Sequence, residues 1–333
     1  MANTAETKSG PTLCVFRGDA LATYNFGATH PFGPRRYHAF LEEFERRGLD
    51  RRVKLGKPEL AGRAIIELFH EPGYVRFVMD ASASGEGYLD YGDTPSFPGV
   101  FDAAATVVGT VVTAIDAVMG ASCRQAFIPI AGLHHARRDR AGGFCVFNDC
   151  GVAIEYLRSR HGIERIAYVD IDAHHADGVF YSFEDDPHLF IVDFHEDGRY
   201  LYPGTGFAEE TGKDGAEGTK QNFPMPPGST DPEFFAAWKK AEAFIDACRP
   251  EFVLFQCGAD SIMADPITHL AYTTAVHRHV AGRLREIADR HAEGRLVALG
   301  GGGYDPGNLA TAWCEVISGL IAAEPTAAGG NLQ

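Results

Sequence analysis

The feature that most constrains the fold of this chain is a regular alternation of short apolar runs with longer helix-like stretches. Apolar, β-branched or aromatic runs occur at 12–16, 125–130, 165–171, 188–194, 252–257 and 295–300. Stretches of helical character lie between several of them, at 101–119, 150–160, 232–247 and 273–291. This alternation is typical of buried parallel strands joined by crossover helices. We therefore predict an α/β fold whose central, mostly parallel sheet carries helices on both faces.

Composition restricts the class of protein further. The chain has 333 residues, of which 45% are hydrophobic and 23% charged, so it can bury a core and is neither disordered nor fibrous. We expect one domain over 12–323, with flexible segments at 1–11 and 324–333. The first eleven residues are polar and no apolar run approaches the roughly 18 residues of a membrane span, which predicts a cytoplasmic protein without a membrane partner.

Charge and cysteine content exclude two kinds of partner or site. The net charge of −15 argues against nucleic acid as a partner. The seven cysteines contain no CxxC pair, which predicts reduced thiols rather than a disulfide framework or a cysteine zinc site.

Unusual polar residues follow four of the predicted strands directly. In chain order these residues are His134 and His135, then Asp170, Asp172, His174 and Asp177, then Asp260, and finally Gly300 to Gly303 with Tyr304. In open α/β sheets, ligands bind at the carboxyl edge of the strands. We therefore predict the active site at that edge.

Two carboxylates and one imidazole form a candidate metal site. Asp172 and His174 are two residues apart, so in extended backbone they leave the chain on the same side, and Asp260 follows another strand. Three protein ligands with an open position are the plan of a catalytic zinc site, although iron suits the same donors. The alternative is an ordinary charged loop, which the position at the strand ends disfavours.

The remaining polar residues suit acid–base chemistry. His134 and His135 could supply a general base and its partner, with Asp170 and Asp177 as orienting acceptors; a surface or core histidine pair is the alternative. The four glycines before Tyr304 permit a sharp turn that brings its phenol to an oxyanion, unless the segment is merely a flexible loop.

Several motifs together resemble the zinc-dependent histone deacetylase family of the arginase/deacetylase superfamily. The similarity is strongest to the bacterial, acetoin-utilisation-type branch, which is class I-like. It spans at least 125–315 and extends to His30-Pro-Phe-Gly-Pro. Its motifs are Leu133-His-His-Ala-Arg-Arg, Gly143-Phe-Cys-Val-Phe-Asn-Asp149, Tyr168-Val-Asp-Ile-Asp-Ala-His-His-Ala-Asp-Gly-Val179, Phe194-His-Glu-Asp-Gly-Arg-Tyr-Leu-Tyr-Pro-Gly-Thr-Gly206, Gln256-Cys-Gly-Ala-Asp-Ser261 and Gly300-Gly-Gly-Gly-Tyr304.

The resemblance implies a role for each site residue. Zinc would be held by Asp172, His174 and Asp260. The general base would be His135, oriented by Asp177, and His134, oriented by Asp170, would tune the field and help protonate the leaving amine. Tyr304 would stabilise the oxyanion.

The resemblance also implies how substrate and a second cation are bound. Gly143, Phe144 and Phe194 would line a channel for the lysine methylenes, although both phenylalanines could instead be core residues. Asp93 would grip substrate backbone amides at the rim. Potassium would lie near Asp170, Asp172, His174, Asp193 and Phe194, held partly by backbone oxygens.

Two departures from the family pattern matter. Ala176 stands where the family commonly has glycine, which is acceptable only if the backbone φ there is negative. The segments at Asp265-Pro266 and Tyr304-Asp-Pro-Gly307 lack the arginines that bind inositol phosphate in eukaryotic relatives, so no corepressor complex is expected.

The function expected from these residues is hydrolysis of an acyl-lysine amide in a protein or peptide. Deacylation of a small acylated amine, such as an acetylpolyamine, is the alternative. A binuclear manganese ureohydrolase would need a second carboxylate cluster, and the stretch from Asp260 to Asp265-Pro266 lacks its middle aspartate. A non-catalytic acyl-lysine binding module would be expected to lose Tyr304 or a metal ligand, and all are present.

Overall fold

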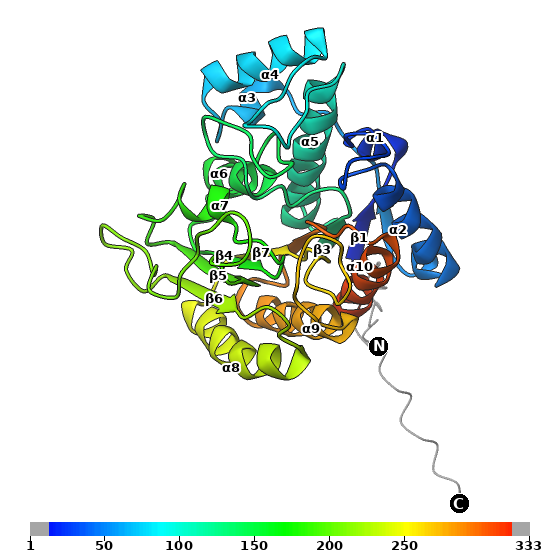
Figure 1. Cartoon of the computed structure of the whole chain (residues 1–333). Coiled ribbons are helices and arrows are strands. Elements are labelled where there is room, and N and C mark those ends of the chain that lie inside the picture. Colours follow the sequence, from blue (N-terminus) through cyan, green and yellow to red (C-terminus); the bar gives the residue numbers. More distant parts are fainter. Residues whose placement is uncertain (1–12, 322–333) are drawn as a thin grey trace, which may run out of the picture.

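The fold is built on one sheet of eight parallel strands (Figure 1). The computed structural model describes residues 13–321, so both ends of the predicted domain and the predicted flexible segments lie outside the described residues. The strand order is β2-β1-β3-β8-β7-β4-β5-β6. The strands are β1 Leu13–Phe16, β2 Lys54–Gly56, β3 Gln125–Ile128, β4 Ile166–Asp170, β5 Leu189–Glu196, β6 Lys220–Met225, β7 Phe252–Gln256 and β8 Leu296–Leu299.

All six apolar runs recognised in the sequence form strands, which confirms the predicted parallel sheet. The two strands that the sequence pattern missed, β2 and β6, are the edges of the sheet. Strand β2 has only three residues, and β6 contains Pro224 and is only partly buried. Edge strands lack the continuous apolar run that marks a strand buried on both faces, because one side of each has no neighbouring strand.

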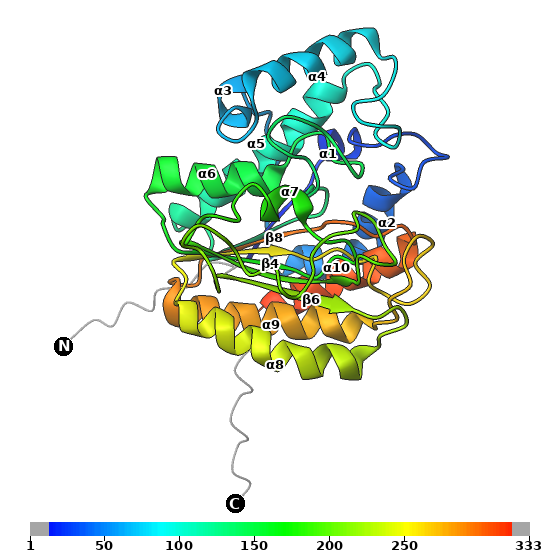
Figure 2. The ribbon, with the colours of Figure 1, turned by 60° about the vertical axis from the view of Figure 1, so that its left-hand side comes forward.

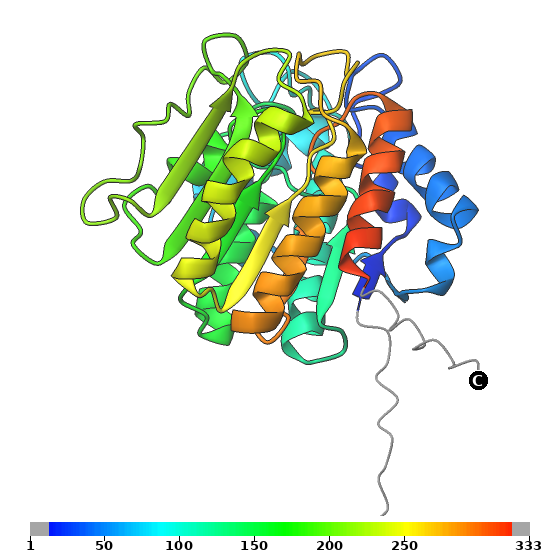
Figure 3. The same cartoon turned by 90° about the horizontal axis from the view of Figure 1, so that it is seen from below.

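Helices cover both faces of the sheet, as predicted. One face carries α8 (Asp231–Cys248), α9 (Thr274–His291), α10 (Pro306–Leu320) and α2 (Arg35–Arg46), which run side by side in Figure 3. Figure 2 shows the opposite face covered by α5 (Val100–Met119), α6 (Asp149–His161) and, farther out, α4 (Pro72–Ser84). The shorter helical segments are α1 Asp19–Ala22, η1 Leu49–Arg51, α3 Arg63–Ile66 and α7 Asp177–Phe180.

Helix α5 is long and apolar enough to cross a membrane by length and composition. The expectation that no apolar run approaches that length is therefore wrong. Asp102 and Asp116 interrupt the apolar sequence of the helix, but its mean hydropathy stays in the range of a membrane span. Most of α5 is buried, and it packs against β1, β3, β8 and α6. Helices of this composition also form the cores of globular folds, and the packing of α5 is of that kind.

The strand order determines where the site forms. The four strands whose carboxyl ends lead into the polar residues singled out in the sequence are β3, β8, β7 and β4, and they are consecutive neighbours at the centre of the sheet. Because all of them are parallel, their carboxyl ends meet at one edge. Segments far apart in sequence are thereby brought to one place.

Candidate active site

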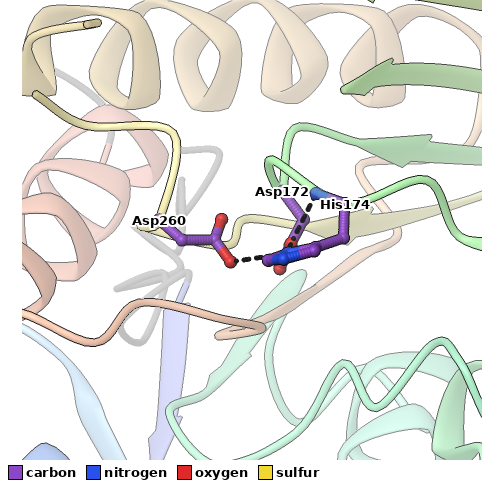
Figure 4. Close-up of side chains that lie close together, drawn as sticks. All are labelled: Asp172, His174 and Asp260. Carbon is purple, nitrogen blue, oxygen red and sulfur yellow. Dashed lines mark hydrogen bonds and ion pairs between the residues drawn. The ribbon is translucent and has the colours of Figure 1, made fainter. Parts of the chain in front are cut away.

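The three predicted metal ligands lie together in a buried cluster (Figure 4). His174 Nδ1 lies 3.0 Å from Asp172 Oδ1 and 3.1 Å from Asp260 Oδ2. One ligand atom from each residue falls within 4.8 Å of the others, and all three side chains are buried. Asp172 and His174 come from the loop after β4, whereas Asp260 comes from the loop after β7. The structure thus assembles the ligand set that the sequence predicts.

Backbone and amide donors fix both carboxylates of this cluster. The Ala173 N–H donates to Asp260 Oδ1 at 2.7 Å, and the Gly302 N–H donates to Asp172 Oδ2 at 2.8 Å. Gln256, the last residue of β7, donates its side-chain amide to Asp172 Oδ2 at 2.9 Å. One oxygen of each carboxylate is therefore committed to the protein, while the other points towards His174.

Electrostatics show that the cluster fits a cation. Asp170, Asp172, Asp193 and Asp260 are each at most 1% exposed. Within the described part of the chain, their ion-pair partners are histidines alone, without a lysine or arginine. Burying this much negative charge is costly unless a cation is held nearby. Two carboxylates and one imidazole are suitable donors for zinc or iron, so the residues fit a catalytic divalent ion.

Two histidine–aspartate pairs lie beside the predicted metal ligands. His134 Nδ1 lies 2.8 Å from Asp170 Oδ2, and His135 Nδ1 lies 2.8 Å from Asp177 Oδ1. Each carboxylate is held in turn, Asp170 by the Tyr168 hydroxyl at 2.6 Å and Asp177 by Arg137 at 3.1 Å. The predicted pairing of histidine with aspartate is therefore present, with both Nε2 atoms directed away from the carboxylates.

The two imidazoles also contact each other, at 3.1 Å between their Nε2 atoms. A hydrogen bond between two ring nitrogens requires one of them to be protonated. Burial opposes protonation of both, but Asp170 and Asp172 raise the pKa of His134 to about 9. Burial and the neighbouring His134 lower the pKa of His135 to about 4. The environment therefore separates the two histidines into a proton carrier and a proton acceptor.

The glycine turn brings Tyr304 to the site. Its N–H donates to Asp265 Oδ2 at 2.8 Å. Arg36, which the sequence analysis missed, donates to the carbonyl oxygens of Gly303 at 2.8 Å and Gly301 at 2.6 Å. Burial, together with the charges of Asp260 and Asp172, raises the pKa of Tyr304 well above its ordinary value. The phenol therefore keeps its proton and can donate a hydrogen bond.

Asp265 lies outside the group of potential ligands, and its oxygens accept from the backbone N–H groups of Tyr304 and Ile267. Among the described residues, the group of three or more potential ligands is Asp172, His174 and Asp260. The second carboxylate cluster that a binuclear ureohydrolase would need is not formed by these residues.

Three residues form the wall beside the two histidines: Gly143 contributes its backbone, and Phe144 and Tyr202 contribute their rings. A side chain at Gly143, whose φ is +55°, would lie 2.4 Å from His135 Cδ2, so only glycine fits against that ring. The Phe144 ring packs edge-on against Tyr304, with 5.8 Å between centroids. The Tyr202 ring lies 5.1 Å from that of His135.

A cavity of about 340 Å³ opens beside this wall and places Asp93 at the mouth. Its lining includes His135, Asp177 and Tyr202 as well as Asp93. The Asp93 carboxylate is exposed, and its backbone oxygen lies 3.1 Å from His30 Nε2. The structure therefore brings the predicted rim residue to the entrance of the site.

The prediction that Phe194 lines this channel is wrong. Its ring is 1% exposed and stacks on Phe223 at 4.4 Å, against Phe234 and Trp238 of α8. Side chains alternate along a strand, so Phe194 of β5 points to the α8 face while its neighbours Asp193 and His195 point the other way. Tyr202, which precedes Pro203 in the loop after β5, occupies the position beside His135 instead. The Tyr-Pro-Gly turn in the sequence was the available signal.

The backbone at Ala176 has the negative φ that an alanine at this position requires. Its φ is −73°, so a methyl group in place of glycine causes no backbone strain. Its N–H donates to Asp193 Oδ2 at 2.9 Å, and His195 Nδ1 lies 2.7 Å from Asp193 Oδ1. Asp193, one of the predicted potassium ligands, therefore contacts the loop that follows His174.

Comparison with known proteins agrees with this fold. A solved structure described as the HDA15 HD domain superposes with a TM-score of 0.86 over 96% of this chain and 92% of that chain, at 24% identity. The likeness establishes an α/β fold of the deacetylase type. The Histone deacetylase domain model matches residues 30–320, and the chain belongs to that family.

Curated relatives share most of their length with the chain. The acetoin utilization protein AcuC of Bacillus subtilis (strain 168) is 35% identical over 307 residues, which cover 88% of this chain and 79% of that protein. AcuC of Staphylococcus aureus (strain MRSA252) is 31% identical, with coverage of 91% and 80%. The predicted acetoin-utilisation-type branch is confirmed. The protein is a hydrolase of the deacetylase type.

Proposed function

We propose that the protein is a zinc-dependent deacylase that hydrolyses the side-chain amide of acyl-lysine in proteins or peptides. One observation carries the proposal. The cluster of predicted metal ligands lies beside His135, which Asp177 orients, and beside Tyr304, whose pKa is raised by burial and by the carboxylates of the cluster. Amide hydrolysis requires a Lewis acid, a general base and an oxyanion donor, and this arrangement can supply all three.

Asp172, His174 and Asp260 would hold the ion. When bound, zinc lowers the pKa of water to about 7 and polarises a carbonyl. Iron would serve the same donors. The second oxygen of each carboxylate is held by the protein, so the ligands are oriented in advance and little reorganisation is needed on binding.

His135 acts in this proposal as the general base. Asp177 accepts a hydrogen bond from the Nδ1–H of His135, which leaves Nε2 as the unprotonated nitrogen that takes a proton from the attacking water. His134, held by Asp170, lies 3.1 Å away and returns a proton to the leaving lysine amine. The Tyr304 hydroxyl donates to the oxygen of the tetrahedral intermediate, where negative charge develops.

The lysine side chain enters past Gly143, Phe144 and Tyr202. Ring faces and a glycine backbone suit a chain of methylenes, which has no hydrogen-bonding groups. At the mouth, Asp93 accepts hydrogen bonds from substrate backbone amides. We further propose a potassium ion near Asp170 and Asp193, action in the cytoplasm, and no inositol-phosphate-dependent corepressor complex.

Release of acetate from an acetyl-lysine peptide tests the proposal directly. The zinc-loaded wild type is expected to hydrolyse the peptide. The zinc-loaded Tyr304→Phe variant should have a kcat roughly 10²–10³-fold lower, because one oxyanion donor is removed. Unchanged circular dichroism and zinc content would show that the variant is folded and loaded. A large preference for acetylpolyamines over acetyl-lysine peptides would favour the small-amine alternative, and equal turnover by Tyr304→Phe would refute the assigned role.

A further inference from the structure

One rim of the active-site mouth exposes three aromatic side chains. Phe77 of α4 is 46% exposed, and Tyr88 and Tyr91 of the following loop are 56% and 104% exposed. Single exposed aromatics are ordinary, but a group on one side of a site mouth points to a binding surface. The acid–base chemistry proposed above does not use any of them.

These side chains border a second cavity that adjoins the active-site cavity. The second cavity has a volume of about 280 Å³, and its apolar lining is formed by Tyr74, Phe77, Tyr88 and Leu89. Both cavities are also lined by the same four residues, Asp90, Tyr91, Arg140 and Ala141. We call these two adjoining cavities together the rim groove; His135 lines one end of it and helix α4 the other.

Hydrogen bonds hold the wall of the rim groove in place. Asp90 Oδ1 accepts from the N–H groups of Gly92 at 3.0 Å, Asp93 at 3.1 Å and Thr94 at 2.9 Å. The Thr94 hydroxyl oxygen accepts in turn from the N–H of Phe144 at 3.1 Å. The loop is thereby connected to the channel wall, so the groove is preformed rather than created by binding.

The charged groups of the groove already have partners within the protein. Arg140 Nη1 lies 2.9 Å from Asp139 Oδ1, and three backbone donors satisfy Asp90. The end of the rim groove next to α4 therefore presents mainly aromatic and aliphatic surface to a ligand. A cavity of about 280 Å³ is at the small end of ligand pockets, which suits one large side chain.

We propose that the rim groove binds an aromatic or large aliphatic side chain located within two residues of the acyl-lysine in a polypeptide substrate. This inference rests on the proposed function, because it requires the acyl-lysine to enter beside His135. Consecutive residues of an extended chain advance about 3.3–3.6 Å, so a near neighbour of the lysine reaches the adjoining cavity. Phe77 and Tyr88 are then specificity-determining residues. An acetylpolyamine has no side chain to occupy the groove.

A peptide series tests the inference. The zinc-loaded full chain is assayed with acetyl-lysine peptides in which phenylalanine replaces alanine at one of the two positions on either side of the lysine. A capped single acetyl-lysine measures turnover without any neighbour. We expect kcat/KM to rise roughly 10-fold or more at one position, since filling an apolar pocket yields about 10- to 200-fold discrimination. Equal values at all four positions would overturn the inference while leaving the proposed function intact.

Substitution in the groove identifies the residues responsible. Phe77→Arg is expected to abolish the preference for phenylalanine and to favour glutamate at the same position, with the capped acetyl-lysine turned over as in wild type. Met79→Arg is the matched control, because Met79 lies on the same helix, is 40% exposed and does not line the groove. Identical behaviour of the two variants would refute the role of the groove. Failure of the zinc-loaded wild type to hydrolyse any of the acetyl-lysine peptides or the capped acetyl-lysine would refute the proposed function, and the inference with it.

Discussion

Gly302 lies so close to Asp260 that a methyl group on its Cα would stand 2.1 Å from the carboxylate oxygen Oδ2. The same atom would stand 2.8 Å from Asp172 Oδ2. The Gly302 N–H meanwhile donates to Asp172. The glycine turn therefore positions the predicted metal ligands as well as Tyr304, because its backbone packs directly against both carboxylates.

Replacing this glycine should damage the metal site. Gly302→Ala is expected to lower zinc affinity by roughly 10–100-fold, the range found when groups that orient metal ligands are disturbed. Zinc content after dialysis against a graded chelator measures the change. Gly62→Ala is the control, since nothing lies within 4 Å of the added methyl group. Full zinc retention by Gly302→Ala would show that the carboxylates move aside without cost.

Metal binding should also stabilise the fold, because Asp170, Asp172 and Asp260 are buried together. A ligand that binds only the folded state raises the free energy of unfolding by about 2.7 kcal/mol when its free concentration is 100 times Kd. Zinc is therefore expected to raise the melting temperature of the wild type, and a chelator to lower it. Asp260→Ala removes a ligand and should melt at the same temperature with and without zinc. A zinc response of equal size in that variant would indicate binding elsewhere.

Much of the site could be predicted because its residues are encoded locally. Asp172 and His174 share one loop at the end of a strongly apolar strand, and Asp260 and Tyr304 follow strands of the same kind. Parallel strands place their carboxyl ends at one edge of the sheet, so the sequence pattern predicts that edge, and the strand order then makes the four strands neighbours.

The residues that were missed depend on tertiary packing. Arg36 belongs to α2, and nothing in its local sequence shows that its guanidinium reaches the carbonyls of Gly301 and Gly303. Phe194 was misplaced because a motif match does not reveal which face of β5 a side chain occupies. Tyr202 lies in a loop whose path cannot be read from periodicity.

The assignment of Phe194 to the core and of Tyr202 to the channel wall can be tested by measuring stability and activity. Phe194→Ala is expected to lower the free energy of unfolding by about 3–5 kcal/mol, the cost of removing a buried aromatic ring. Tyr202→Ala should cost far less stability, because its side chain is 47% exposed, but should lower kcat/KM for acetyl-lysine substrates. Urea unfolding and steady-state kinetics on both variants provide the comparison. A large kinetic defect in a fully folded Phe194→Ala protein would restore the original assignment.

Protonation of His70, which is 1% exposed, should loosen the loop that carries His134 and His135 at acid pH. The N–H of Asn148 donates to His70 Nε2 at 2.8 Å, and the Asn148 side-chain amide donates to the carbonyls of His134 and Ala136. Burial lowers the pKa of His70 to about 3. An unfolded chain protonates this histidine near its ordinary pKa of about 6.5, so below that pH the unfolded state binds the extra proton.

Stability is therefore lost as the pH falls from about 6.5 towards 3, and this residue contributes about 1.4 kcal/mol per pH unit. His70→Gln retains an acceptor for Asn148 without a titrating group. Its unfolding free energy should fall less steeply than that of the wild type between pH 6.5 and 4.5, as measured by urea denaturation at several pH values. Comparison of the two slopes cancels the acid sensitivity that the rest of the chain contributes to both proteins. Parallel slopes would show that His70 is protonated equally in the folded and unfolded states, and the link from His70 through Asn148 to His134 would then carry no pH dependence.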